Sequence, residues 1–293
     1  MYPGSLAKSI PDKPAYIMAN GGEVVTYGQL DEASNRAAQL FWSLGLRPGD
    51  HIAFCLENHP RFFEICWAAQ RSGLYFTAIS SRLTPTETEY IVDDSGAQIF
   101  VTSSAKGDLA EELLGKCPGL KARFMTDNAQ TGYASWEEAT ANQPAEPLEQ
   151  ELEGAQMLYS SGTTGRPKGV KHPLSHQPAG SIPPLLALIT AAYGATEDSV
   201  YLSPAPLYHA APLAYNMAFQ RVGATSVCTV VALGRTGSGI SGARCTLTSA
   251  SVGQRRDEVM CTRSFVARAS GTRSRLRLPM VVPSPSHSQP CAP

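Results

Sequence analysis

The chain has 293 residues, 43% of them hydrophobic and 17% charged, which suffices for one large domain or two ordinary ones. Its net charge of -1 gives no reason to expect binding to nucleic acids. No basic and apolar leader opens the chain, no apolar stretch reaches the roughly 18–20 residues that span a bilayer, and the seven cysteines form no CxxC pair. We therefore expect a cytoplasmic protein without a membrane span, for which peripheral membrane contact stays open.

The first 130 residues alternate patterns typical of helices and of strands. Thr26 and Gln29 form a capping box ahead of apolar residues at helical spacing, and Thr84-Pro85-Thr86-Glu87 forms a second one with proline at the first helical position. Strands separated by helices of about 10–15 residues indicate parallel βαβ units, so the fold class is α/β. The patterns predict helices over 26–44, 60–72 and 84–96, and strands over 51–56, 74–79 and 98–102.

The next hundred residues contain a connection and further elements. Residues 143–154 are rich in proline and acids, which is typical of a surface connection. The apolar run 155–159 predicts a short buried strand, and 182–193 predicts a buried helix that Gly194 ends as a left-handed cap. Two more strands are expected over 200–202 and 225–231. We find no internal repeat.

The composition changes abruptly near residue 233. From Gly234 onward the chain has nine arginines, no lysine and two acids, which leaves 15 basic and 23 acidic residues before it, so the body carries -8 and the tail +7. With Phe265 as its one aromatic residue, the tail has too little apolar surface to offset chain entropy of about 1–2 kcal/mol per residue. We expect a domain over 1–232 and a disordered tail over 233–293. Arginine without lysine is typical of an out-of-frame reading of GC-rich DNA; a genuine basic tail is the alternative.

The strongest chemical signal is the segment 157–169, MLYSSGTTGRPKG. An apolar strand runs into hydroxyls and glycines whose amides and hydroxyls can turn toward an anion, and Lys168 adds a mobile positive charge suited to phosphate oxygens. This indicates a cradle for a triphosphate. It is not a Walker loop, because Lys168 follows a proline and precedes Gly169-Val170. A flexible Ser/Gly linker would need neither the strand before it nor the fixed Pro-Lys-Gly after it.

The segment SSGTTGRPKGV resembles the phosphate loop of the adenylate-forming (AMP-binding) superfamily, which includes acyl-CoA synthetases, luciferases and the adenylation domains of peptide synthetases. The region from Pro11 to about Gly73 is similar to the family's N-terminal region, and PAPLYH, at 204–209, is similar to its next core motif. The resemblance extends from about Pro11 to Val230, and it is strongest to bacterial fatty-acyl-CoA synthetases (long-chain-fatty-acid–CoA ligases). It implies the large N-terminal domain of the adenylate-forming fold, with helices flanking layered sheets, in incomplete form.

The resemblance also implies roles for individual residues. Lys168 would help to hold or release pyrophosphate, and His209, with Tyr208, would border the substrate carboxylate and the acyl channel. Magnesium, held through ATP, would lie near the hydroxyl of Thr163. The substrates would be ATP, CoA and a fatty or other carboxylic acid. The residues expected to surround the ATP phosphates are Ser160, Ser161, Gly162, Thr163, Thr164 and Gly165.

Several other matches carry less weight. Tyr193-Gly194-Ala195-Thr196-Glu197 copies the pattern with which the family holds adenine, but in the family that motif follows the aromatic-His motif, whereas here it precedes His209. We interpret it as a coincidental helix end. His172 and His176 are expected at the surface beside the loop. No role is expected for the remaining histidines, His51, His59 and His287.

The parts that complete the family's reaction are not found after Val231. These are the adenine motif, an aspartate for the ribose, a hinge, and the small C-terminal lid domain with its lysine; no lysine occurs beyond Lys171. Losing one preorganised donor already costs about 10²–10³ in rate. The chain therefore contains no complete catalytic set, and we expect it to be inactive or nearly so.

Two alternatives to a fatty-acyl-CoA synthetase fragment stay open. One is another adenylate-forming ligase, such as an aryl-CoA ligase or a stand-alone adenylation domain. The other is a non-catalytic module that binds a nucleotide or an acyl group and uses a genuine basic tail for interactions.

Overall fold

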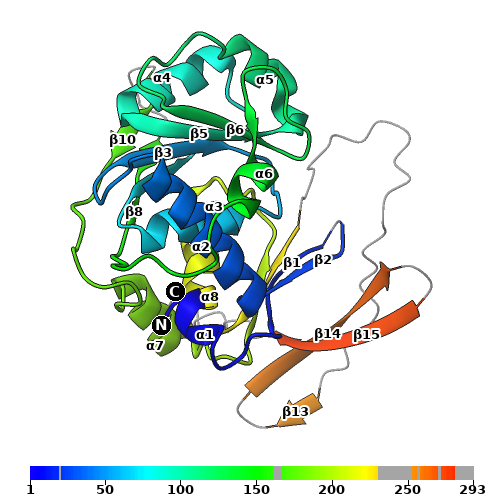
Figure 1. Cartoon of the computed structure of the whole chain (residues 1–293). Coiled ribbons are helices and arrows are strands. Elements are labelled where there is room, and N and C mark those ends of the chain that lie inside the picture. Colours follow the sequence, from blue (N-terminus) through cyan, green and yellow to red (C-terminus); the bar gives the residue numbers. More distant parts are fainter. Residues whose placement is uncertain (20, 161–165, 230–252, 256–257, 270–271, 281–293) are drawn as a thin grey trace, which may run out of the picture.

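A computed structural model describes residues 1–19, 21–160 and 166–229, together with the backbone of three strands between residues 253 and 280. Within these residues two sheets form the body of the protein, and helices pack against them (Figure 1). The α/β class expected from the alternating patterns is confirmed.

The larger sheet has six strands in the order β7-β6-β5-β3-β4-β8, and every pair is parallel. Its centre, β3, is buried along its whole length because helices cover both faces. Ile52 and Phe54 of β3 join the core beneath α2 and α3, whereas Ala53 and Cys55 join a second core beneath α4 and α5 (Figure 1). The strands are β3 (His51–Cys55), β4 (Tyr75–Ala78), β5 (Ala97–Ser103), β6 (Ala122–Thr126), β7 (Ala134–Ser135) and β8 (Ala155–Gln156).

The helices of this half begin and end largely where local signals place them. Thr26 caps α2 and Thr84 caps α4, each through the predicted capping box, and Gly96 ends α4 in the left-handed conformation. The helices are α2 (Tyr27–Ser43), α3 (Phe62–Arg71), α4 (Pro85–Ser95), α5 (Gly107–Glu112) and α6 (Trp136–Ala141), with a 3-10 turn η1 over Ser104–Lys106.

The second sheet has four strands in the order β11-β12-β1-β2, and it joins the start of the chain to residues about two hundred positions later. Tyr16 of β1 lies opposite Ser226 of β12 in a parallel pair, and β2 adds an antiparallel edge. The strands are β1 (Pro14–Met18), β2 (Glu23–Thr26), β11 (Val200–Ser203) and β12 (Thr225–Cys228); the helices are α1 (Pro3–Leu6), α7 (Pro184–Tyr193) and α8 (Ala210–Arg221).

Two predictions of burial were wrong. The helix over 182–193 was expected to be buried, but only Leu186 and Ile189 of α7 are, while Leu188 is half exposed. Gly194 does end this helix in the left-handed conformation, as predicted. The supposed surface connection 143–154 is partly buried, because Glu151 and Glu153 pair with the buried Arg71 and Arg221.

In the tail, the structure describes the backbone of three strands. They are β13 (Gly253–Arg255), β14 (Glu258–Ala269) and β15 (Thr272–Met280), which form a sheet in the order β13-β14-β15. The remainder of the tail lies outside the described residues. A domain boundary near residue 232 stays a prediction.

Candidate functional site

The predicted phosphate-binding segment forms a β-hairpin. Strands β9 (Leu158–Ser160) and β10 (Lys168–Val170) are antiparallel, and Lys168 is the backbone partner of Ser160. The two ends of the glycine-hydroxyl segment are therefore held next to each other, with the exposed Lys168 on the second strand. The predicted ligands of the ATP phosphates Ser161, Gly162, Thr163, Thr164 and Gly165 lie outside the described residues.

The hairpin is not part of the six-stranded sheet, and this corrects the expectation of a buried strand. Met157 is buried, but Leu158 and Tyr159 are only partly buried and Ser160 is exposed. The larger sheet ends with β8, where Tyr75 and Phe76 of β4 pair with Ala155 and Gln156. β9 and β10 then form a two-stranded sheet of their own.

Gly169 of the second strand lies close to side chains of the first. A Cβ on Gly169 would lie 3.1 Å from the ring and hydroxyl of Tyr159 and closer still to the flexible end of Met157. A side chain there would need the Tyr159 ring to shift by a few tenths of an ångström and the end of Met157 to move aside. Packing therefore favours a glycine after Lys168, independently of any ligand.

Beneath the hairpin, a buried histidine helps to fix the chain where it enters β9. The Thr77 hydroxyl donates to the carbonyl of Met157 (3.1 Å), so it accepts from Nε2 of His51 (3.0 Å). Nδ1 of His51 is then the unprotonated nitrogen, and it is buried without a partner. Burial, together with the charge of Lys171, lowers the pKa of His51 to about 4. No role was expected for His51 from the sequence.

The second predicted motif forms the loop before α8. Tyr208 is buried, His209 is exposed at the N-cap of α8, and their ring centroids lie 4.5 Å apart. Asn58, which follows β3, fixes this loop. Its Oδ1 accepts from the amide of Leu207 (2.8 Å), and its Nδ2 donates to the carbonyl of Thr229 (2.9 Å). Sequence reasoning missed Asn58, although a polar residue directly after a predicted buried strand is a usable signal.

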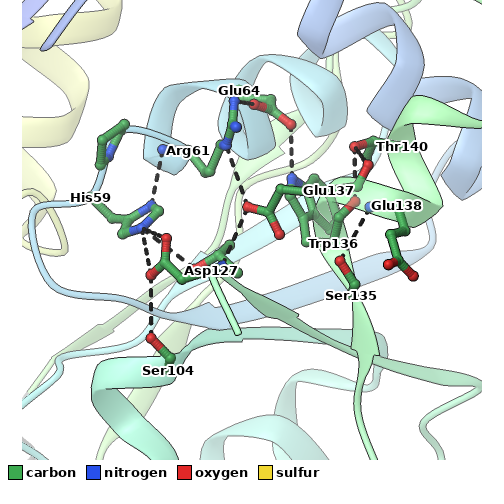
Figure 2. A network of polar contacts seen from close by, with 12 residues as sticks. His59, Arg61, Glu64, Ser104, Asp127, Ser135, Trp136, Glu137, Glu138 and Thr140 are labelled. Carbon is green, nitrogen blue, oxygen red and sulfur yellow. Dashed lines mark hydrogen bonds and ion pairs between the residues drawn. The ribbon is translucent and has the colours of Figure 1, made fainter. Parts of the chain in front are cut away.

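The carboxyl ends of β3, β5 and β6 meet at a cluster of histidine, aspartate and serine (Figure 2). Nε2 of His59 lies 3.3 Å from both carboxylate oxygens of Asp127, and the hydroxyl of Ser104 lies 3.4 Å from one of them. Nδ1 of His59 accepts from the amide of Arg61 (3.1 Å). Both ring nitrogens are engaged and neither reaches Ser104, so the cluster is not a nucleophile-and-base arrangement despite its residue types. Its geometry indicates a structural link between strand ends.

The copy of the adenine motif is placed as the end of a helix. Gly194 is the left-handed cap of α7, and the Glu197 carboxylate lies at the surface 3.8 Å from the ammonium of Lys13. His172 and His176 are exposed, as expected.

The predicted residues form two groups, one at the β9–β10 hairpin and one in the loop before α8. Among the described residues, no hydrogen bond or ion pair joins Lys168 to Tyr208 or His209. A cavity of about 450 Å³ is lined by α4, from Thr86 to Asp94, and another of about 210 Å³ lies between the β1–β2 hairpin and α2, α3. Neither is lined by the predicted residues.

Two further features concern cofactors and membranes. Within the described ranges, no group of three or more His, Cys, Asp or Glu side chains is placed to hold a metal ion. The predicted contact of magnesium, Thr163, lies outside those ranges. None of the helices in the described part is both long and apolar enough to cross a membrane.

The chain belongs to the family of AMP-binding enzymes, because the family model matches residues 6–249. Its fold is that of the N-terminal domain of adenylate-forming enzymes. A long-chain-fatty-acid-CoA ligase from Archaeoglobus fulgidus superposes with a TM-score of 0.65 at 21% identity, over 77% of this chain and 45% of that one. At that identity the likeness shows the fold alone.

Curated proteins similar to this chain include two kinds of CoA ligase. A crotonobetaine/carnitine–CoA ligase of Shigella flexneri serotype 5b (strain 8401) is 34% identical over 178 residues, which is 56% of this chain and 34% of the relative. A 3-hydroxybenzoate–CoA ligase of Aromatoleum sp. (strain CIB) is 29% identical over 171 residues, 57% of this chain and 32% of the relative. The chain thus spans about a third of the length of the curated relatives it matches.

Proposed function

We propose that this chain carries the ATP-phosphate and acyl-binding part of an ATP-dependent CoA ligase. The observation that supports this proposal most directly is the hairpin, which holds Ser160 opposite Lys168 at the two ends of the glycine-hydroxyl segment. In the reaction implied, a carboxylate oxygen attacks the α-phosphorus of ATP, pyrophosphate leaves, and a CoA thiol then displaces AMP. The ammonium of Lys168 would neutralise charge on the phosphates, together with the amides and hydroxyls of residues 160–165. Magnesium would arrive with ATP.

The first test measures nucleotide binding. Titration of the chain with ATP in a calorimeter should give a weak dissociation constant in the millimolar range, because residues for adenine and ribose are not found. Lys168→Ala should weaken it about tenfold or more, since a charge-assisted contact is lost. Lys116→Ala serves as the matched control, because this lysine pairs with Glu89 at the surface. Equal binding by the wild-type and Lys168→Ala proteins would refute the assignment of Lys168.

The second part of the proposal is that the 293-residue chain does not complete the reaction. Supplied with ATP, CoA and fatty acids of several lengths, it should release no AMP above background. Robust formation of an acyl-CoA thioester would overturn this part and leave the binding proposal in place.

A fatty acid is the first candidate substrate, on the resemblance of the phosphate-loop and PAPLYH segments. An aryl acid is the second, favoured by the aromatic pair Tyr208 and His209 and by the 3-hydroxybenzoate–CoA ligase relative. Thermal shifts with fatty acids, hydroxybenzoates and carnitine should separate the candidates. The shift with the true acid class should be lost in His209→Ala and kept in His172→Ala, an exposed histidine outside the motif.

A further inference from the structure

On either side of the glycine-hydroxyl segment, one residue contacts α4. Before the segment, the hydroxyl of Tyr159 donates to Oδ2 of Asp94 at 2.6 Å. After it, the guanidinium of Arg166 lies 5.4 Å from the ring centroid of Tyr90. Tyr90 and Asp94 are four residues apart on one helix face, and the Tyr90 hydroxyl lies 3.4 Å from the other oxygen of Asp94.

These contacts matter because the other contacts that hold the hairpin lie at its far end, where Met157 and Lys171 meet β4. Its strands have three residues each, and a two-stranded hairpin is marginally stable on its own in water. The far end of β10 rests on β4, where the ammonium of Lys171 lies 4.1 Å from the ring centroid of Tyr75 and the Tyr75 hydroxyl donates to the carbonyl of His172 (2.8 Å). The end that carries the glycine-hydroxyl segment depends on α4.

We propose that Tyr90 and Asp94 are positioning residues for the ATP-binding hairpin, which they dock through Arg166 and Tyr159. The inference rests on the proposed function and adds a second element, α4, to the phosphate site. Asp94 supplies the stronger contact, because a hydrogen bond to an ionised carboxylate is short and about twice as strong as a neutral one. Tyr90 supplies a face for the cation of Arg166 within the range of a cation–π contact.

The expected size of the effect follows from the Asp94 contact. The loss of a hydrogen bond to a charged group changes a docking equilibrium by about tenfold to a hundredfold. The apparent affinity for ATP falls only by the fraction of molecules that become undocked. We therefore expect the dissociation constant for ATP to rise by about three- to tenfold.

The test uses four variants of the full chain and two measurements. Asp94→Ala and Tyr159→Phe remove the contact, Asp94→Asn keeps an oxygen acceptor, and Asp93→Ala is the control that removes an exposed carboxylate from the same helix. Hydrogen exchange over residues 157–172 without nucleotide measures docking, and ATP titration measures positioning. Asp94→Ala and Tyr159→Phe should speed exchange about tenfold and weaken ATP binding. Asp94→Asn should show a smaller change in the same direction, because it keeps a neutral acceptor, and Asp93→Ala should stay close to wild type.

The two measurements distinguish the docking of the hairpin on α4 from its role in ATP binding. Unchanged exchange in Asp94→Ala and Tyr159→Phe would overturn the docking contact. Faster exchange with unchanged ATP affinity would overturn the positioning role. If the wild-type chain binds no ATP, the proposed function fails, the positioning role fails with it, and the exchange rates still decide whether α4 docks the hairpin.

Discussion

The buried His51 should make the stability of the protein depend on pH. In the folded state its Nε2 donates to Thr77, and its Nδ1 is buried without an acceptor, so an added proton would find no partner. Burial and the nearby Lys171 lower its pKa to about 4, against an ordinary value of about 6.5. Between these values the unfolded chain binds a proton that the folded chain does not. The stabilisation is therefore fully present above about pH 6.5 and is lost as the pH falls toward 4.

The size of this effect follows from the shift. The full pKa shift of about 2.5 corresponds to about 3.4 kcal/mol in the free energy of unfolding. Of this, about 2 kcal/mol is lost between about pH 7 and pH 5. Urea unfolding at both pH values gives the free energy of unfolding. Wild type should lose about 2 kcal/mol more than His51→Gln, which cannot titrate.

The matched control is His172→Gln, which removes an exposed histidine near the same strand end. Its loss of stability on acidification should equal that of wild type. If His51→Gln lost as much stability as wild type, the buried imidazole would not be the source, and the account of its neutral, singly hydrogen-bonded state would be refuted.

Two further changes test the packing of the fold. Glu153→Gln should destabilise the protein by about 3–5 kcal/mol in urea unfolding, because the buried Arg221 loses the carboxylate 2.7 Å away. The control Glu32→Gln breaks a surface pair with Arg36 and should cost under about 1 kcal/mol. Similar losses of stability in both variants would contradict a stabilising role of the buried pair. Thr84→Ala should cost about 1 kcal/mol through the lost cap of α4, with Thr84→Ser restoring most of it; an unchanged midpoint in the alanine variant would show that the cap contributes nothing.

The elements of the first hundred residues were predictable because their signals are local. The capping boxes at Thr26 and Thr84 contain both partners within four residues, and each begins its helix as predicted. The order of the strands was not predictable in this way. The pair between Tyr16 and Ser226 joins segments that carry no shared local signal, so the second sheet emerges only in the fold.

Burial was misjudged where charged side chains find distant partners. A run of glutamates is ordinarily exposed, and this made 143–154 look like a surface connection. Glu151 and Glu153 are instead held by Arg71 and Arg221, which lie 80 and 68 residues away in the sequence. For α7 the burial was overestimated instead. Its apolar composition does not reveal how much of its surface other elements cover.

The candidate site shows the same division between local and distant information. The phosphate-loop motif could be found from its residue types, and the pairing of Ser160 with Lys168 follows from the short segment between them. The contacts that place the hairpin could not, because Tyr90 and Asp94 belong to a helix face that the sequence presents as solvated. β9 lies outside the larger sheet, so side-chain contacts such as these contribute to its position where no ladder of sheet hydrogen bonds joins it to β4. The proposed positioning role thus predicts that a substitution on α4 weakens nucleotide binding while every residue of the motif stays intact.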